Sequence, residues 1–296
     1  MSWKIAGCSI LLFVLQHIVR VIYSFGYHLH YYQHYPGPCQ QVEGIDLGSA
    51  SLYTLPDGLT LITSGFSMNL LSPSYQAFYE EKGARGGVYM MDLKNASGEL
   101  APVPLSVVAE HSGFNPQSFR PHGISVWHDH DSGRYIVFVV NHPVREVDRV
   151  EKFVLDRGNG TLLHVKTYTS PKLRSLYDVQ AVGEDSFYVS NVLYEQRSRF
   201  FMLLELFSLM PWSSVVLYQP ETGYSQVVSG LTSATGLLVS PCGLFVYVLS
   251  CMGAEIRVYR RQEDNSLLLQ QSYPLFTHPD MAAMDPSTGD LFVGAH

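Results

Sequence analysis

The chain is poor in charged residues and has no excess of basic ones. Only 15% of its 296 residues are charged, and 26 acidic residues outnumber 19 basic ones, so the formal net charge is −7. A nucleic-acid-binding surface needs clustered Lys and Arg, so this composition argues against a nucleic-acid partner. Because 46% of the residues are hydrophobic, a large core can be buried, and the composition argues against a disordered chain.

Cysteine is also scarce. Four cysteines at positions 8, 39, 242 and 251 fit neither a metal-binding knuckle nor a disulfide-dense scaffold. Cys242 and Cys251 flank one predicted strand, and we expect both to be buried thiols. Tyr and Phe, in contrast, are plentiful at 19 and 15, which favours strands over helices.

The N-terminal region is apolar. Residues 5–19 follow Lys4 and are almost wholly hydrophobic, which is typical of a secretory signal. No small-x-small cleavage motif follows, and a second apolar and aromatic stretch begins after Arg20, so a cleaved signal and an uncleaved signal anchor both fit. We expect residues 5–25 to associate with a membrane, and residues 1–38 to be a signal or anchor segment with a linker.

Two triplets have the form of N-glycosylation sequons. They begin at Asn95 and Asn159, and both lie in turn-like segments. They support entry into the secretory pathway, with the protein either secreted or held at a membrane in the endoplasmic reticulum or outside the cell.

A Pro/Asp/Gly turn followed by an apolar, β-rich run recurs along the chain. The five main runs are residues 55–65, 131–141, 182–191, 240–250 and 285–294. Secondary strands are expected at residues 86–93, 150–156, 213–220 and 255–261. Short strands in groups with regular turn signals favour an all-β protein and a β-propeller with about five blades, while a pair of β-sandwiches is the alternative.

Residues 120–143 predict a β-hairpin that carries two histidines. His122 lies in PHGIS and His142 in VVNHP, on either side of a polar turn. A hairpin would bring both to one end of a sheet, where a pair of imidazoles is suited to proton transfer near neutral pH. Two unrelated histidines at strand ends are the alternative. The HDHD sequence at 128–131 falls in the turn and is expected to face solvent.

One segment departs from the strand pattern. Residues 194–212 have the apolar spacing of an amphipathic helix, with Pro211 at its end. Such a helix between blades covers a site, lies on a membrane surface, or packs on its own domain.

Several motifs follow one another along the chain: the segment beginning CQQVEGIDLGSASLYTLPDG, then PHGIS, VVNHP, the AVG and SP-x-G turns, and DP-x-TGDL-x-VG. Together, and in this order, they resemble the paraoxonase/arylesterase family. The resemblance covers residues 39–296 and implies a six-bladed β-propeller, of which about five blades are present and the last is incomplete. It also implies calcium-dependent hydrolysis of aryl esters and lactones.

The resemblance further implies particular residue roles. His122 would be the base that activates water, and His142 its partner. Two calcium ions would lie in the central tunnel. Asp280 would bind the catalytic ion, while Asp178 and the backbone carbonyl of Ile124 would bind the structural one.

Several ligand positions of the family carry other residues in this chain. The family has Glu-Asp where this chain has Ala50 and Ser51, and it has Asn where this chain has Tyr177, Thr235 and Met281. Calcium needs six to eight oxygen ligands, several of them charged, so we expect calcium binding and hydrolysis to be impaired. The family also continues beyond the point where this sequence stops, so we expect a fragment and a missing partner for Cys39.

Three hypotheses of function follow. The first is a hydrolase of small esters or lactones that acts through His122, His142 and calcium. The second is a non-catalytic, membrane-tethered propeller that binds or helps to assemble membrane proteins. The third is a hydrolase with another metal, held by both histidines and Asp280.

Overall fold

The computed structural model describes residues 2–26, 28, 41–45, 47–65, 81, 83, 85–94, 101–109, 113–143, 146–194 and 198–295. The described strands form five sheets, which we call blades 1 to 5. The first full-length strand of each blade contacts its counterpart in the next blade, and we call it the inner strand. Blade 1 consists of β1 (Ser49–Thr54), β2 (Leu59–Ser64), β3 (Gly87–Asp92) and β4 (Val103–Pro104).

Blades 2 and 3 follow the same antiparallel order. Blade 2 consists of β6 (Pro121–Asp129), β7 (Arg134–Asn141), β8 (Arg149–Asp156) and β9 (Thr161–Tyr168), with the short strand β5 (Ser106–Val108) added parallel to β9. Blade 3 consists of β10 (Leu176–Ala181), β11 (Phe187–Asn191), β12 (Ser213–Gln219) and β13 (Gly223–Leu231).

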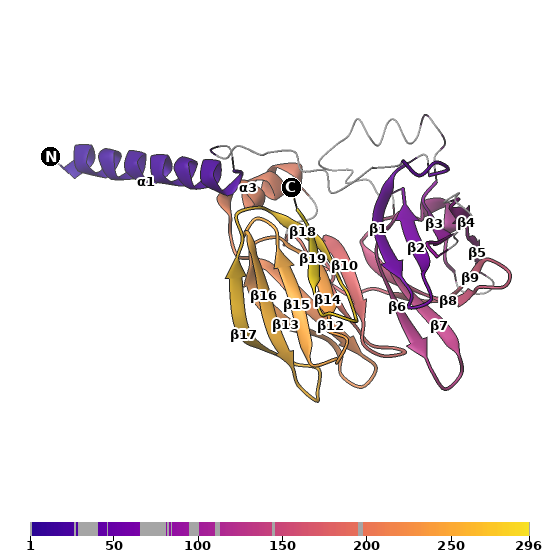
Figure 1. The fold of residues 1–296 in the computed structure, drawn as a ribbon. Coiled ribbons are helices and arrows are strands. Elements are labelled where there is room, and N and C mark those ends of the chain that lie inside the picture. Colours follow the sequence, from indigo (N-terminus) through magenta and orange to yellow (C-terminus); the bar gives the residue numbers. More distant parts are fainter. Residues whose placement is uncertain are drawn as a thin grey trace.

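Blade 4 is four-stranded and blade 5 has two described strands. Blade 4 consists of β14 (Ala234–Val239), β15 (Phe245–Ser250), β16 (Glu255–Arg261) and β17 (Leu267–Pro274), and blade 5 of β18 (Pro279–Met284) and β19 (Leu291–Ala295). The inner strands contact one another in the order β1, β6, β10, β14, β18, as Figure 1 also shows. This arrangement is a β-propeller with four complete blades and part of a fifth, so the predicted class is confirmed and the paired sandwiches are wrong.

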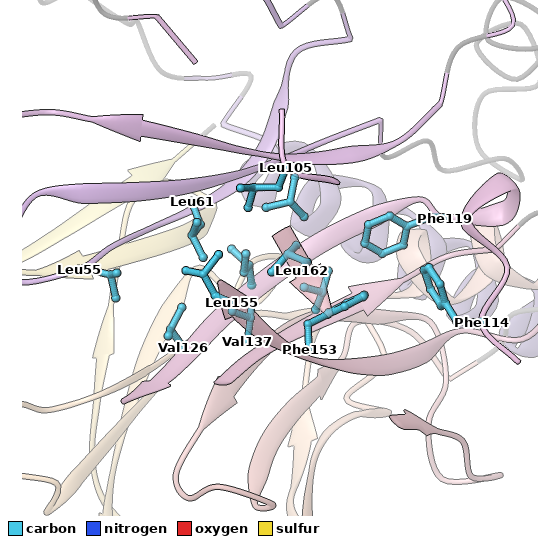
Figure 2. Packing of buried hydrophobic residues seen from close by; sticks show 13 residues of the cluster. Leu55, Leu61, Leu105, Phe114, Phe119, Val126, Val137, Phe153, Leu155 and Leu162 are labelled. Carbon is cyan, nitrogen blue, oxygen red and sulfur yellow. The ribbon is translucent and has the colours of Figure 1, made fainter. Parts of the chain in front are cut away.

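The hydrophobic core lies between neighbouring blades. Figure 2 shows the cluster that joins blade 1 to blade 2, in which Leu61 and Phe153 are fully buried. Two similar clusters join blade 2 to blade 3 and blade 3 to blade 4. Each buried Leu or Phe stabilises the fold by about 1.5–3 kcal/mol, so the blades are held together chiefly by apolar side chains and not by backbone bonds between sheets.

The helix predicted for residues 194–212 is present but shorter than predicted. Helix α3 spans Arg199–Ser208, and the chain leaves it through Leu209, which has a left-handed backbone with φ of 53°. The helix therefore ends before Pro211. Met202 and Glu205 are buried, whereas Phe200, Phe201, Leu204 and Phe207 are exposed, so much of the apolar surface of the helix does not pack on the propeller.

Helix α1 (Ser2–Ser24) extends away from the propeller (Figure 1). Its residues Ile5–Ser24 are apolar enough to cross a membrane, with a mean hydropathy of 2.0. Its last turns reach α3, where Nε2 of His17 lies 2.9 Å from the carbonyl oxygen of Phe207.

Two local predictions need correction. Cys242 is exposed, because it lies in the turn between β14 and β15 and not in a strand. In the HDHD segment, His130 and Asp131 are exposed in the turn, but His128 and Asp129 belong to β6 and are half-buried. Asn95 and Cys39 lie outside the described residues.

Candidate active site

The predicted hairpin brings the two histidines together. Pro121 pairs with Asn141 in the β6–β7 register, and the backbone N–H of His142 donates to the carbonyl of Arg120 over 3.0 Å. As a result, Nε2 of His142 lies 3.3 Å from Nδ1 of His122. The two imidazoles therefore share a hydrogen bond at the start of the inner strand of blade 2.

His122 is almost completely buried, with 3% of its surface exposed. The edge of its ring meets the ring of Tyr177 at a centroid distance of 4.4 Å. Burial, and then the nearby His142, lower the pKa of His122 well below its usual value. The imidazole is therefore neutral at physiological pH, as a general base must be.

A third residue, Asp148, extends the histidine pair. Its Oδ1 lies 3.0 Å from Nδ1 of His142, and its Oδ2 accepts a 2.9 Å hydrogen bond from the backbone N–H of Leu176. Asp148 is 8% exposed. The sequence reasoning missed this residue, although an acidic residue six positions after His142 was a signal that it could have used.

A buried polar network supports the hairpin from behind. The side chain of Asn141 accepts from the backbone N–H of Arg120 and donates to Glu151, over 2.9 Å in each case. Glu151 is fully buried and also accepts a 2.6 Å bond from Thr167 and lies 3.0 Å from Nε2 of His164. This network fixes the backbone from which both site histidines project.

Asp178 lies directly beside the HGIS segment. A Cβ atom on Gly123 would lie 2.6 Å from the Cα of Asp178, so only glycine fits at this position. Oδ1 and Oδ2 of Asp178 accept 2.9 Å bonds from the backbone N–H groups of Val179 and Leu237. Even so, burial raises the pKa of this carboxyl to about 7.

Tyr177 and Asp280 form a second pair, between blades 3 and 5. The Tyr177 hydroxyl donates a hydrogen bond to Oδ1 of Asp280. Burial, and then the charge of Asp280, raise the pKa of Tyr177, so the phenol stays protonated and remains the donor. Burial also raises the pKa of the nearby Cys251 thiol to about 12.

The predicted metal residues lie close to one another, but they do not fit a calcium ion. Ile124 and Asp178 line a cavity of about 480 Å³, whose wall also includes Ala50, Ser51 and Met281. The Asp178 oxygens are engaged by backbone donors, and Asp280 accepts from Tyr177. Within the described part of the chain, no three His, Cys, Asp or Glu side chains are grouped closely enough to hold a metal.

Calcium takes six to eight oxygen ligands, several of them charged, whereas both carboxylates predicted to bind it, Asp178 and Asp280, already accept hydrogen bonds from the protein. The alternative of two histidines and Asp280 around another metal has no such group among the described residues either. Nε2 of His142 and Nδ1 of His122 face each other, and Nδ1 of His142 faces Asp148.

The fold and this pair define a β-propeller protein with two histidines in contact where the inner strand of blade 2 begins. Comparison with known proteins identifies the family, because the model of the Arylesterase family matches residues 34–296. The chain is 34% identical over 258 residues to serum paraoxonase/arylesterase 2 of Gallus gallus and 35% identical to that of Homo sapiens, covering 87% of this chain and 69% of each relative. It therefore belongs to the paraoxonase/arylesterase family.

Two further similarities are informative. Serum paraoxonase/lactonase 3 of Mus musculus is 33% identical over 261 residues, which covers 88% of this chain and 70% of the relative. A solved luciferin-regenerating enzyme superposes with a TM-score of 0.50 and 10% identity, covering 86% of this chain and 70% of the other. The latter similarity concerns the fold alone.

Proposed function

We propose that this chain hydrolyses small aryl esters or lactones, with His122 as the general base and His142 as its proton-sharing partner. The observation that carries this proposal is the 3.3 Å contact between Nε2 of His142 and Nδ1 of His122. Membership of a family that includes arylesterases and a lactonase supports the substrate class.

In this reaction His122 removes a proton from water, and the resulting hydroxide adds to the carbonyl carbon of the substrate. The C–O bond to the leaving alkoxide or phenoxide then breaks, and the imidazolium returns the proton to that oxygen. The buried, neutral His122 is suited to the first step. Both products, a carboxylic acid and an alcohol or phenol, stay joined in one molecule when the substrate is a lactone.

The rate is expected to be low. A calcium ion would polarise the carbonyl and stabilise the oxyanion, but its ligand positions hold Ala50 and Met281, and Tyr177 donates to Asp280. Losing one oxyanion-stabilising group costs roughly 10²–10³ in turnover. We therefore expect turnover at least about 100-fold below that of a relative with a complete calcium site.

The test is hydrolysis of phenyl acetate and of a δ-lactone by the purified full chain. His122→Gln should lower kcat/KM roughly 10²–10⁴-fold, the usual contribution of a general base. His128→Gln is the matched control, because His128 is a half-buried histidine on the same strand at the hairpin end. Equal loss in both variants, or wild-type turnover no higher than that of His122→Gln, overturns the proposal.

The second candidate function is that of a non-catalytic, membrane-tethered binding or assembly factor. The Tyr177–Asp280 hydrogen bond favours it, because this bond engages a carboxylate that the family resemblance assigns to calcium. A folded wild-type protein without turnover above the His122→Gln background would support this function.

We further infer that α1 holds the propeller at a membrane within the secretory pathway. None of the residues in the apolar window of Ile5–Ser24 is buried in the protein, so this surface needs another apolar environment. Asn159 is exposed in the β8–β9 turn, where a glycan could be attached, and Asn95 lies outside the described residues. Resistance to alkaline extraction and an Asn159→Gln mobility shift test the two parts separately.

A further inference from the structure

Asp148 contacts His142, the proposed partner of the general base. It precedes β8, is buried, and bridges blade 2 to the start of blade 3 through His142 and the backbone of Leu176. We propose that Asp148 is a positioning residue: it fixes the tautomers of both histidines so that Nε2 of His122 is the basic nitrogen. This inference rests on the proposed function for its catalytic meaning, but its structural part can be tested without turnover.

The orientation of the Asp148 carboxylate is set by a backbone group. The N–H of Leu176 can only donate, and it donates to Oδ2 over 2.9 Å. The other oxygen, Oδ1, then faces Nδ1 of His142 at 3.0 Å. A carboxylate oxygen only accepts hydrogen bonds, so the proton of neutral His142 must lie on Nδ1.

The consequence passes to the second ring. With its proton on Nδ1, neutral His142 has an unprotonated Nε2, which must accept at the 3.3 Å contact with Nδ1 of His122. Neutral His122 therefore carries its proton on Nδ1 and leaves Nε2 unprotonated. When Nε2 takes a proton from water, the Nδ1 proton can be shared with His142, and the charge of Asp148 stabilises the resulting cation.

The two glutamates nearest to Asp148 in the chain, Glu146 and Glu151, have another partner. Arg149 pairs with Glu146 over 3.0 Å and with Glu151 over 3.1 Å. These pairs lie on the side of β8 that faces the buried network of Asn141 and Glu151. Asp148, in contrast, contacts His142 directly.

The substitution Asp148→Asn gives a directional test. Its single carbonyl oxygen should stay at the N–H of Leu176, because the amide NH₂ group cannot accept there. The NH₂ group then faces Nδ1 of His142 and forces the proton of that ring to Nε2. A comparable Asp-to-Asn change in Ser-His-Asp proteases traps the wrong tautomer and lowers kcat about 10⁴-fold.

The experiment is a long-range ¹H–¹⁵N correlation spectrum of the full chain, which reports the protonated nitrogen of each imidazole. His164 is an internal reference of opposite sense, because its Nε2 lies 3.0 Å from the Glu151 carboxylate. We expect Nδ1–H for His142 and Nε2–H for His164. In Asp148→Asn, His142 should change to Nε2–H while His164 does not.

The control is Glu146→Gln, which removes a carboxylate from the same loop without touching His142. It should leave both tautomers and the hydrolysis of phenyl acetate unchanged, whereas Asp148→Asn should lower that hydrolysis at least about 100-fold. An Nε2–H tautomer of His142 in the wild type overturns the inference, even if Asp148→Asn does not fold. The predicted tautomers without wild-type turnover overturn the proposed function but not the tautomer assignment.

Discussion

The Tyr177 hydroxyl donates a hydrogen bond to Asp280, a residue 103 positions later in the chain, and so joins the inner strands of blades 3 and 5. By the family resemblance, position 177 would instead supply an oxygen ligand to a calcium ion. The Tyr177 side chain thus makes a hydrogen bond within the protein where the family resemblance implies a bond to a metal ion. This substitution of one contact for another has consequences for stability, pH dependence and chemistry.

The first prediction concerns this hydrogen bond. Tyr177→Phe keeps the ring that packs against His122 but leaves the Asp280 carboxylate without the phenol. The free energy of unfolding should fall by about 1–3 kcal/mol, as for a hydrogen bond to a charged group. Tyr273→Phe, on the exposed outer strand β17, is the control and should change it by less than about 0.5 kcal/mol. Urea denaturation measures both values, and equal effects would show that the bond contributes nothing.

The second prediction is a pH dependence that comes from Asp178. Its pKa is about 7 in the folded protein and near its ordinary 3.8 in the unfolded chain. The folded state therefore binds the proton more tightly, and stability is lost as pH rises from about 4 to about 7. Between pH 5 and pH 7 the loss should be on the order of 2 kcal/mol.

The Asp178→Asn variant should lose this part of the pH dependence. One of its two backbone partners would then face an amide NH₂ group, so we expect the variant to be less stable overall. The slope of stability against pH is thus the quantity to compare, measured by thermal denaturation in a calcium chelator. An unchanged slope in the variant would assign the titration to another group.

The third prediction concerns the buried network behind the histidines. Glu151 is fully buried and its two oxygens receive bonds from Asn141 and Thr167 and contacts from Arg149 and His164. Glu151→Ala removes the carboxylate that these groups contact in a buried site, so the free energy of unfolding should fall by about 3–5 kcal/mol. The exposed Glu184→Ala is the control, because its ion pair with Arg134 is at the surface. If Glu151→Ala and Glu184→Ala lower the midpoint of urea denaturation equally, Glu151 does not stabilise the fold through this network.

Local sequence patterns predicted the parts of the molecule that are close in the chain. The hairpin of residues 120–143 and the meeting of His122 with His142 follow from strand alternation and a polar turn. The recurring turn-and-strand theme likewise gave the blades, since every main and secondary strand it indicated is present.

Contacts between blades were beyond such patterns. Asp148 reaches the backbone of Leu176, which is 28 residues away, and Tyr177 reaches Asp280 across two blades. Both depend on how the sheets pack around the axis, and no local periodicity encodes that. The end of α3 was also not predicted: the helix stops at Ser208 and is followed by Leu209 with a left-handed backbone, before Pro211.

The most direct test of calcium-independent hydrolysis at the His122–His142 pair is the initial rate of phenyl acetate hydrolysis, measured in millimolar calcium and again in excess chelator. Because Ala50, Tyr177 and Met281 stand where oxygen ligands are needed, we predict a low rate that is the same in both solutions and is abolished by His122→Gln. A rate that disappears in chelator and returns when calcium is restored would contradict this, and would mean that other oxygens complete a calcium site.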